Sequence, residues 1–283
     1  MEHGKEIGRL SNPATHQDGR SYRSLSLESV SKVSARCKMY GRDVEIAALE
    51  TGVVPERYSR NMGTYSLKQQ AALLKSCVSV VGLGGLGGVV VEVLARMGVG
   101  TLRLIDGDTF EESNLNRQFL STERGLRETK VGAAVARIKA INSSIEALAY
   151  PEYMNEENAV ELIDKSDVII DCLGGIKDRF VLAKASRKVG CPLVSGAIAG
   201  LAGQVTTIFP EDKGLEQVYG EPDTLPATGV EASLGCLPQI ATLVATLECS
   251  EAAKILLNHE VLFRNRILII DLQENVFEVF QLD

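Results

Sequence analysis

The hydrophobic positions of this chain follow two alternating patterns. Short apolar runs predict buried strands at residues 78–81, 101–105, 167–171 and 192–195, with a weaker strand near 146–150. Between them, apolar residues recur every three or four positions and predict helices at 66–75, 86–97, 129–141, 156–164 and 178–189. Strands that alternate with helices build a parallel sheet covered on both faces. We therefore expect an α/β fold with a Rossmann-like, doubly wound, mostly parallel sheet.

The pattern changes after Gly203. We expect a strand at 203–209, a loop at 210–230 rich in Gly, Pro, Asp and Glu, a helix at 237–257, and strands at 266–271 and 276–282. The last two strands should extend the sheet in the antiparallel direction, and they either complete the core or present a face to a partner. A loop as long as 210–230 within a compact domain is often functional.

Residues 1–56 differ from the rest of the chain. Roughly the first twenty residues are mixed polar, with Gly, Pro and Asn and no period, and they predict a disordered start. Apolar periodicity then predicts helices at 27–40 and 44–50. We expect a small helical N-terminal extension over 1–56, then an irregular linker at 55–63 leading into one domain over 57–283. The extension packs on that domain, contacts a second subunit or recognises a partner.

Composition narrows the function classes. The chain has 30 basic and 37 acidic residues and a net charge of −7, which argues against a broad nucleic-acid or anionic-membrane surface. No apolar run is long enough for a membrane span, and the polar start lacks a signal-peptide core, so we expect a cytoplasmic protein without membrane or nucleic-acid partners. The six cysteines form no CxxC pair, so no zinc site is expected.

A glycine-rich turn follows the first strand of the expected core. The segment 78–87 reads VSVVGLGGLG, and it places Gly82, Gly84, Gly85 and Gly87 between a strand and a helix. Glycines tolerate positive φ and let a phosphate approach the backbone, and the helix N-terminus favours an anion. Asp106 ends the next strand, nineteen residues after Gly87, where a doubly wound fold places an acid on the ribose hydroxyls. This order of features predicts a nucleotide site.

Several motifs in order resemble the ThiF/MoeB/HesA family, the bacterial relatives of ubiquitin-activating enzymes. The resemblance covers about 57–283 and rests on RYSRN at 57–61, GLGGLGG, IDGDTFEESNLNRQ at 105–118, Lys130, the strand end at 171–179, SGAIAGLAGQV at 195–205 and the segment from GVEASLG to KILL. It implies an enzyme that binds ATP and Mg²⁺. Such an enzyme adenylates the C-terminal glycine carboxylate of a small ubiquitin-like sulfur-carrier protein, which ends in Gly-Gly, and releases pyrophosphate.

The resemblance assigns roles residue by residue. Asp106 matches the acid that holds the ribose, while Asn114, Arg117 and Gln118 belong to the N-x-x-R-Q element that meets the phosphates. Lys130 matches the family lysine at the same site. Arginine, lysine and Mg²⁺ are the usual means of stabilising charge that builds on phosphorus.

Arg60 matches the arginine that reaches the ATP of the neighbouring subunit. The resemblance therefore implies a homodimer with two shared sites, in which Arg60, Arg117 and Lys130 carry the catalysis. Taken alone, Arg117 or Lys130 would more often be a solvated surface charge, and Arg60 could pair with Glu56; taken as a set, they favour the site.

The chain departs from the family at the metal. The family carries Asp-Asn after the fourth strand, where the Asp binds Mg²⁺, and this chain has Gly174 and Gly175 there. Glycine has no side chain to ligate a metal, so Asp171, at the strand end, is the candidate ligand, with Asp178 on the following helix as the alternative.

The chain also departs from those family members that carry a nucleophilic cysteine in the crossover loop, since no cysteine lies between Cys191 and Cys236. Cys236 precedes the helix at 237–257, where a helix N-terminus can lower a thiol pKa, but buried packing is the stronger interpretation. We expect an adenylating enzyme without its own thiol relay.

Four functions fit these features, in this order. The first is an adenylyltransferase for a sulfur carrier that serves molybdopterin, tungstopterin, thiamine or a related product. The second adenylates a different peptide or small-molecule carboxylate, and the third is a catalytically impaired relative that acts as a binding partner. The fourth is a nicotinamide-dependent oxidoreductase, which leaves the NLNRQ element unused and lacks an evident acid–base pair, because the three histidines lie outside the core pattern.

Overall fold

The main sheet is built as the apolar runs predict. The structure is a computed structural model that describes residues 2–221 and 230–282. Its eight-stranded sheet has the order β11-β10-β9-β8-β7-β4-β5-β6. The strands are β4 (Cys77–Val81), β5 (Thr101–Ile105), β6 (Glu146–Tyr150), β7 (Val168–Asp171), β8 (Leu193–Ala199), β9 (Ala202–Ile208), β10 (Arg266–Asp271) and β11 (Val276–Gln281). Strands β8, β7, β4, β5 and β6 are parallel, and β9, β10 and β11 continue antiparallel, which confirms the expected fold class.

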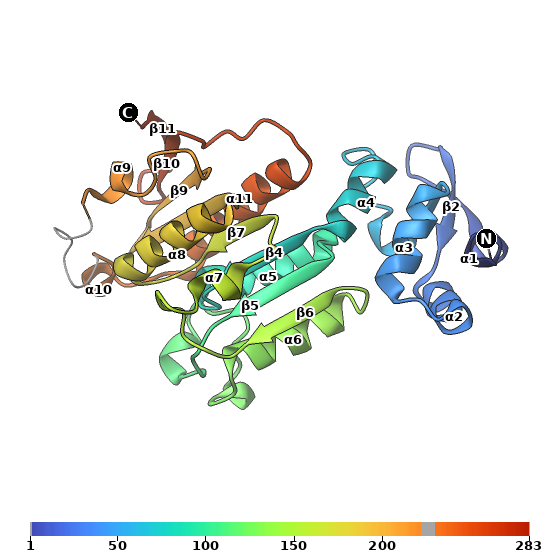
Figure 1. Ribbon diagram of the computed structural model, residues 1–283, viewed down its shortest axis with the longest axis horizontal. Coiled ribbons are helices and arrows are strands. Elements are labelled where there is room, and N and C mark those ends of the chain that lie inside the picture. The colour runs from blue at the N-terminus through green and yellow to red at the C-terminus, as the bar shows by residue number, and fades with distance from the viewer. Residues whose placement is uncertain (1, 222–229, 283) are drawn as a thin grey trace.

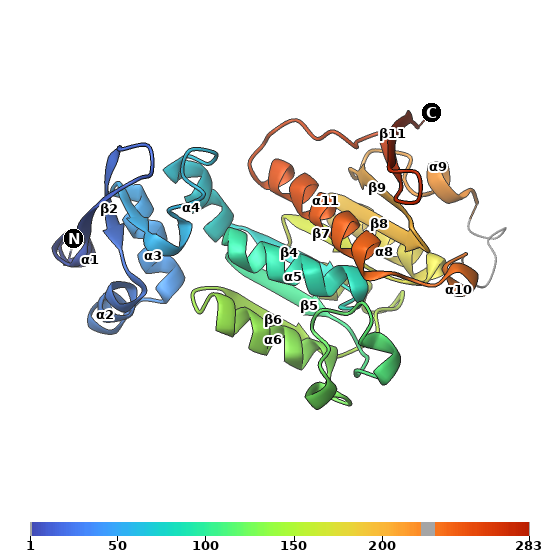
Figure 2. The same cartoon turned by 180° about the vertical axis from the view of Figure 1, so that it is seen from behind.

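Helices cover both faces of this sheet (Figures 1 and 2). One face packs on α5 (Gly85–Met97), α6 (Lys130–Ile141) and α11 (Pro238–Leu256), and the other on α7 (Ala159–Ile163) and α8 (Ile176–Val189). Shorter elements are α4 (Leu67–Lys75), α9 (Glu216–Tyr219), α10 (Glu231–Leu234) and the 3₁₀ turns η1 (Glu56–Tyr58), η2 (Glu112–Asn114) and η3 (Glu123–Gly125). No helix among the described residues is long and apolar enough to cross a membrane.

The start of the chain is ordered, which corrects the expected disorder. The N-terminal elements are α1 (Glu2–Leu10), β1 (Asn12–Thr15), β2 (Ser21–Leu25), α2 (Leu27–Cys37), α3 (Gly41–Glu50) and β3 (Val53–Pro55). Ile7 is fully buried in a cluster with Val30, Val33 and Val44. Arg23 also donates hydrogen bonds to the carbonyl oxygens of Gly8, at 2.9 Å, and Ser11, at 2.6 Å. These contacts join segments distant in sequence, so a local polar pattern could not reveal them.

The expected linker at 55–63 is a packed joint. Tyr58 is fully buried, and its hydroxyl oxygen accepts a hydrogen bond from Nδ2 of Asn142 at 2.8 Å. Its ring lies against Gly98, where a Cβ would come within 2.7 Å of it and where φ is +87°. This joint fixes the N-terminal elements at the end of the sheet where β4 begins (Figure 1).

The two C-terminal strands differ in burial. Ile267, Leu268 and Ile270 of β10 are buried in the core. By contrast, four apolar side chains of the edge strand β11 are 41–52% exposed: Val276, Phe277, Val279 and Phe280. The long loop contains the short helix α9, and its residues 222–229 lie outside the described part of the chain.

Helix α11 contains a buried acidic residue that we expect to lower the stability of the fold. Glu248 is fully buried, and neither of its carboxylate oxygens has a hydrogen-bond partner among the described residues. Its head group packs on Gly196, where a Cβ would lie 2.6 Å from Cδ. Burial, and then the neighbouring Asp171, raises the pKa of Glu248 well above its ordinary value, and the smaller opposing effects of Arg179 and of the Gly196 backbone do not cancel this rise.

We predict that Glu248→Met stabilises the chain at neutral and alkaline pH, by about 1–3 kcal/mol, because an unsatisfied buried polar group costs about that much. The raised pKa lets the folded chain keep a proton that the unfolded chain releases. Stability should therefore fall as pH rises from the unfolded pKa of about 4.3 toward the folded one, and the variant should show less of this fall. Urea denaturation at several pH values measures both effects.

Glu251 provides the matched control, because it is also fully buried but accepts hydrogen bonds from the amide of Phe263, at 3.0 Å, and the hydroxyl of Thr207, at 3.2 Å. Glu251→Met should destabilise the chain. Equal stability of Glu248→Met and the unaltered chain at every pH would contradict the prediction.

Candidate functional site

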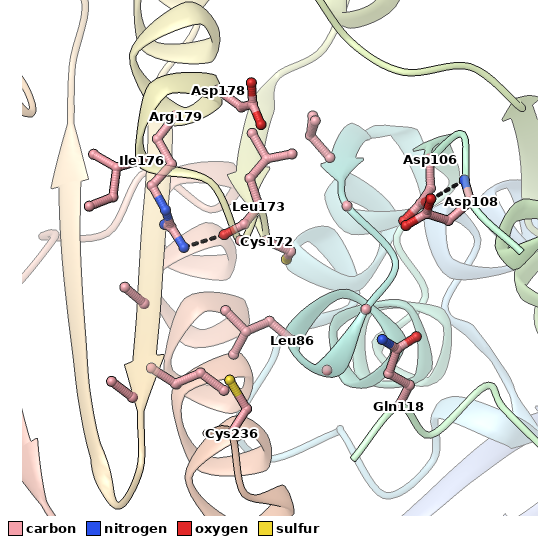
Figure 3. A pocket seen from close by; sticks show the side chains of 18 of the residues that line it. Leu86, Asp106, Asp108, Gln118, Cys172, Leu173, Ile176, Asp178, Arg179 and Cys236 are labelled. Atoms are coloured by element: carbon pink, nitrogen blue, oxygen red, sulfur yellow. Dashed lines mark hydrogen bonds between the residues drawn. The ribbon is translucent and has the colours of Figure 1, made fainter. Parts of the chain in front are cut away.

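The main cavity lies at the carboxyl ends of the parallel strands and has a volume of about 710 Å³ (Figure 3). Its walls come from the turn between β4 and α5, the segments that follow β5, β6 and β7, the β8–β9 hairpin and the approach to α11. Crevices at this end of an open parallel sheet are where such folds bind ligands.

Two glycines of the turn are required by packing. Gly82 has φ of +89°, and a Cβ there would lie 2.7 Å from the carbonyl oxygen of Cys172. At Gly87 a Cβ would lie 1.9 Å from the carbonyl oxygen of Gly82. Gly84 is the N-cap of α5 and makes no side-chain cap, so the first amides of the helix are left for a ligand. Gly84 and Gly85 both line the cavity.

Asp106 braces the same turn. One carboxylate oxygen accepts a hydrogen bond from the amide of Leu83 at 2.7 Å, and the other accepts one from the amide of Asp108 at 2.8 Å. The side chain lines the cavity and is half-buried. Its carboxylate is therefore oriented by the backbone beside the glycine turn, where the sequence places a ribose.

Lys130 is held by two residues that the sequence reasoning missed. Its Nζ lies 2.8 Å from Oδ2 of Asp108, and the hydroxyl of Tyr153 donates to Oδ1 of the same carboxylate. Burial raises the pKa of Asp108, but the hydrogen bonds from Lys130 and Tyr153 outweigh it and lower this pKa. All three side chains line the cavity. The D-G-D spacing of 106–108 was the available signal for Asp108, while nothing local marks Tyr153.

Within the 114–118 element, some side chains line the cavity and others stabilise the local backbone. Arg117 lines the cavity and donates to Oδ1 of Asn116 at 2.8 Å. Gln118 is buried beside Gly84, and its Oε1 has no partner among the described residues. The side-chain oxygen of Asn114 instead accepts from the amide of Glu111 at 3.0 Å, and Asn114 does not line the cavity. This asparagine therefore shapes the η2 turn that presents Arg117.

Asp171 does not face the cavity, in contrast to its expected role as a metal ligand. It is fully buried, with Oδ2 accepting from Nη1 of Arg179 at 3.0 Å and from Oγ of Ser195 at 2.7 Å. Its Oδ1 accepts from the amide of Leu173 at 3.1 Å. Arg179, which the sequence reasoning missed, also donates to the carbonyl oxygens of Leu173 (Figure 3) and Gly196. This ion pair holds the end of β7 in place, and the carboxylate of Asp171 therefore has a structural role.

Gly174 and Asp178 both line the cavity. Cys236 also lines it and is half-buried, and its carbonyl oxygen accepts from Nδ2 of Asn116 at 3.0 Å. Arg60 is exposed and does not line the cavity of its own chain. Among the described residues, no three His, Cys, Asp or Glu side chains gather as a metal cluster.

Known proteins match this chain over most of its length. The family model described as the ThiF family matches residues 58–283. The SAMP-activating enzyme E1 of Haloferax volcanii is 33% identical over 228 residues, which cover 79% of this chain and 83% of that protein. The adenylyltransferase and sulfurtransferase MOCS3 of Arabidopsis thaliana is 39% identical over 163 residues, 56% of this chain and 35% of that protein. The matched part thus spans about a third of that longer relative.

Two solved structures share the fold. Escherichia coli MccB, crystallised with MccA-N7isoASN, aligns with a TM-score of 0.69 and 19% identity, covering 97% of this chain and 95% of that one. PaaA aligns with a TM-score of 0.68 and 22% identity, covering 81% and 82%. At these identities the likeness concerns the fold alone. The extent of the family match and the similarity to the Haloferax relative establish that the chain belongs to the ThiF family.

Proposed function

We propose that this chain is an ATP-dependent adenylyltransferase that activates the C-terminal carboxylate of a small ubiquitin-like sulfur-carrier protein. The observation that carries the proposal is the convergence of the open α5 N-terminus, Arg117 and Lys130 in one cavity beside Asp106. Family membership and relatives named SAMP-activating enzyme E1 and adenylyltransferase MOCS3 support it.

The reaction requires two anions to meet. A carboxylate oxygen of the carrier forms a bond to the α-phosphorus of ATP, and the bond from that phosphorus to the oxygen bridging to the β-phosphate breaks. Pyrophosphate leaves with the electron pair, and no proton is transferred. Arg117, Lys130 and the first amides of α5 counter the negative charge, while Asp106 accepts hydrogen bonds from the ribose hydroxyls.

The Lys130 ion pair positions this lysine in advance. An ammonium group has three donors, and the bond to Asp108 uses one of them. Since Tyr153 holds the other oxygen of Asp108, the lysine is pinned without losing its remaining donors. A phosphate can then be bound with little ordering of the long side chain.

The cavity also offers a route for the carrier tail. Ala197, Ala199 and Ala202 of the β8–β9 hairpin line it, together with the larger Ile198 and Gln204. The small side chains of the three alanines support a path for an extended tail that ends in Gly-Gly. Mg²⁺ bound with ATP would neutralise charge on the phosphates and the leaving group, and Asp178 is the cavity-lining carboxylate available to hold it.

Gly174 favours one alternative, a catalytically impaired relative that binds the carrier without activating it. Pyrophosphate exchange into ATP, assayed with a carrier that ends in Gly-Gly, separates the two. Exchange that depends on the carrier supports the enzyme. Carrier binding without ATP binding or exchange would establish the alternative.

The first site prediction concerns Arg117. Because hydrogen bonds to charged groups are worth about 1.5–3 kcal/mol, Arg117→Ala should weaken ATP binding by about 10- to 100-fold. Calorimetric titration with ATP measures the change. Arg124 is exposed in η3 and does not line the cavity, so Arg124→Ala is the matched control and should bind ATP normally. Equal affinity of the Arg117→Ala variant and the control would remove Arg117 from the site.

The second concerns the proposed homodimer, in which Arg60 serves the partner subunit's site. Arg60→Ala and Lys130→Ala chains should each be inactive alone. In a hybrid dimer, one site would combine the intact Lys130 of one chain with the intact Arg60 of the other. A randomised equal mixture should therefore regain about a quarter of the normal activity. No recovery, with hybrids verified by differently tagged chains, would contradict a shared site.

A further inference from the structure

Two bare glycines follow β7 at the edge of the cavity. Gly174 and Gly175 are both exposed, and neither has a positive φ, so the backbone itself does not call for glycine at either position. A Cβ at Gly174 would meet nothing within 4 Å. Gly174 therefore lies beside open space, and Gly175 is the crowded position of the two.

The side chain of Asp178 lies against Gly175. A Cβ at Gly175 would stand 2.7 Å from Oδ2 of Asp178, closer than real contacts allow. Asp178 lies in the first turn of α8 and lines the cavity, and Figure 3 shows it above the end of β7, on the opposite side of the cavity from Asp106 and Asp108. The glycine thus makes room for the carboxylate of a residue one helical turn further along.

The backbone that presents this carboxylate is rigidly held. The amide of Leu173 donates to Asp171, and the carbonyl oxygen of Leu173 accepts from Arg179. Arg179 is the residue after Asp178 and also binds the carbonyl oxygen of Gly196 on β8, at 2.6 Å. The turn and the start of α8 are therefore clamped to two strands.

The other acids at the cavity already have partners. Asp106 accepts hydrogen bonds from two backbone amides, and Asp108 accepts hydrogen bonds from Lys130 and Tyr153. Glu152 accepts a hydrogen bond from Nδ2 of Asn158 at 3.0 Å. Of the four acidic side chains that line the cavity, Asp178 is the one that takes no hydrogen bond from another described residue.

We propose that Asp178 is the protein ligand for the Mg²⁺ that accompanies ATP, reaching over Gly175 from α8. Mg²⁺ prefers hard oxygen ligands and is usually bound by one or two carboxylates plus substrate phosphates, so one well-placed carboxylate suffices. The inference rests on the proposed adenylyltransferase function. It accounts for the glycine at 175, because a side chain there would displace the carboxylate.

An acid in the first turn of a helix also stabilises that helix through its dipole. The test must therefore measure the Mg²⁺-dependent affinity for ATP as well as the stability of the fold. Calorimetric titration with ATP, with and without Mg²⁺, gives the ratio of the two affinities for each variant. Thermal unfolding of the same variants reports the contribution of Asp178 to the helix.

Asp178→Asn should reduce the Mg²⁺-dependent gain in ATP affinity by about tenfold or more, since even indirect partners of a metal ligand are worth 10- to 100-fold. ATP binding without Mg²⁺ should persist. Asp164→Asn is the matched control, because Asp164 is an exposed acid that follows α7 and does not line the cavity.

Two further variants separate the effect of the position of the carboxylate from the effect of its charge. Gly175→Ala keeps every charge but should push the flexible carboxylate aside, and it should lose most of the Mg²⁺ gain while the fold is kept. Adding Gly174→Asp to Asp178→Asn returns a carboxylate to the turn, where open space exists, and should restore the gain.

The possible outcomes distinguish failure of the Asp178 assignment from failure of the proposed function. Full Mg²⁺ gain in Asp178→Asn would overturn the assignment, as would ATP binding by the unaltered chain that does not respond to Mg²⁺. Both results would leave the ATP site intact. Absence of ATP binding by the unaltered chain would overturn the proposed function and this inference together.

Discussion

The structure depends on the close approach of the β4–α5 turn to the end of β7. At Gly87 and Gly82 any side chain would collide with backbone, at 1.9 Å and 2.7 Å from the nearest carbonyl oxygens. This packing brings the α5 N-terminus to the carboxyl edge of the sheet with its first amides free of side-chain caps. Asp106 then ties its strand end to the turn through the amide of Leu83. The anion site is therefore a product of backbone packing, and the charged side chains are arranged around it.

Two of the cations at the cavity are positioned by acids. Lys130 is pinned by Asp108, and Arg179 is buried on Asp171, so each cation has an acid that fixes it. The first pair holds Lys130 at the cavity. In the second pair Arg179, which also lines the cavity, clamps the turn through the carbonyl oxygen of Leu173. Removing one partner of the buried pair would leave an uncompensated charge, which is strongly destabilising. Glu248 is enclosed near this pair, and burial and the charge of Asp171 raise its pKa.

The sequence predicts the core elements well because each strand and helix there is set by its own apolar period. It fails where a contact comes from a distant segment. Ile7 lies among polar residues, yet it is buried by Val30 and Val44. The helix expected over 27–40 ends at Cys37, because Lys38 takes a left-handed conformation there. Asn114 and Asp171 have the right types for the site, but their partners face them away from the cavity.

The sequence by itself determined the α/β class, the glycine turn, the acid that ends β5 and the cavity-lining Arg117 and Lys130, because periodicity, glycine spacing and motif order are local properties. Only the tertiary structure decided which acids are free. Asp171, Asp108 and Asp178 are equivalent carboxylates in a printed sequence. Their surroundings separate them: Asp171 is enclosed with Arg179, Asp108 is tied to Lys130, and Asp178 stands over a glycine that leaves it room. A carboxylate's chemistry depends on burial and partners, and these arise when strands far apart in the chain meet.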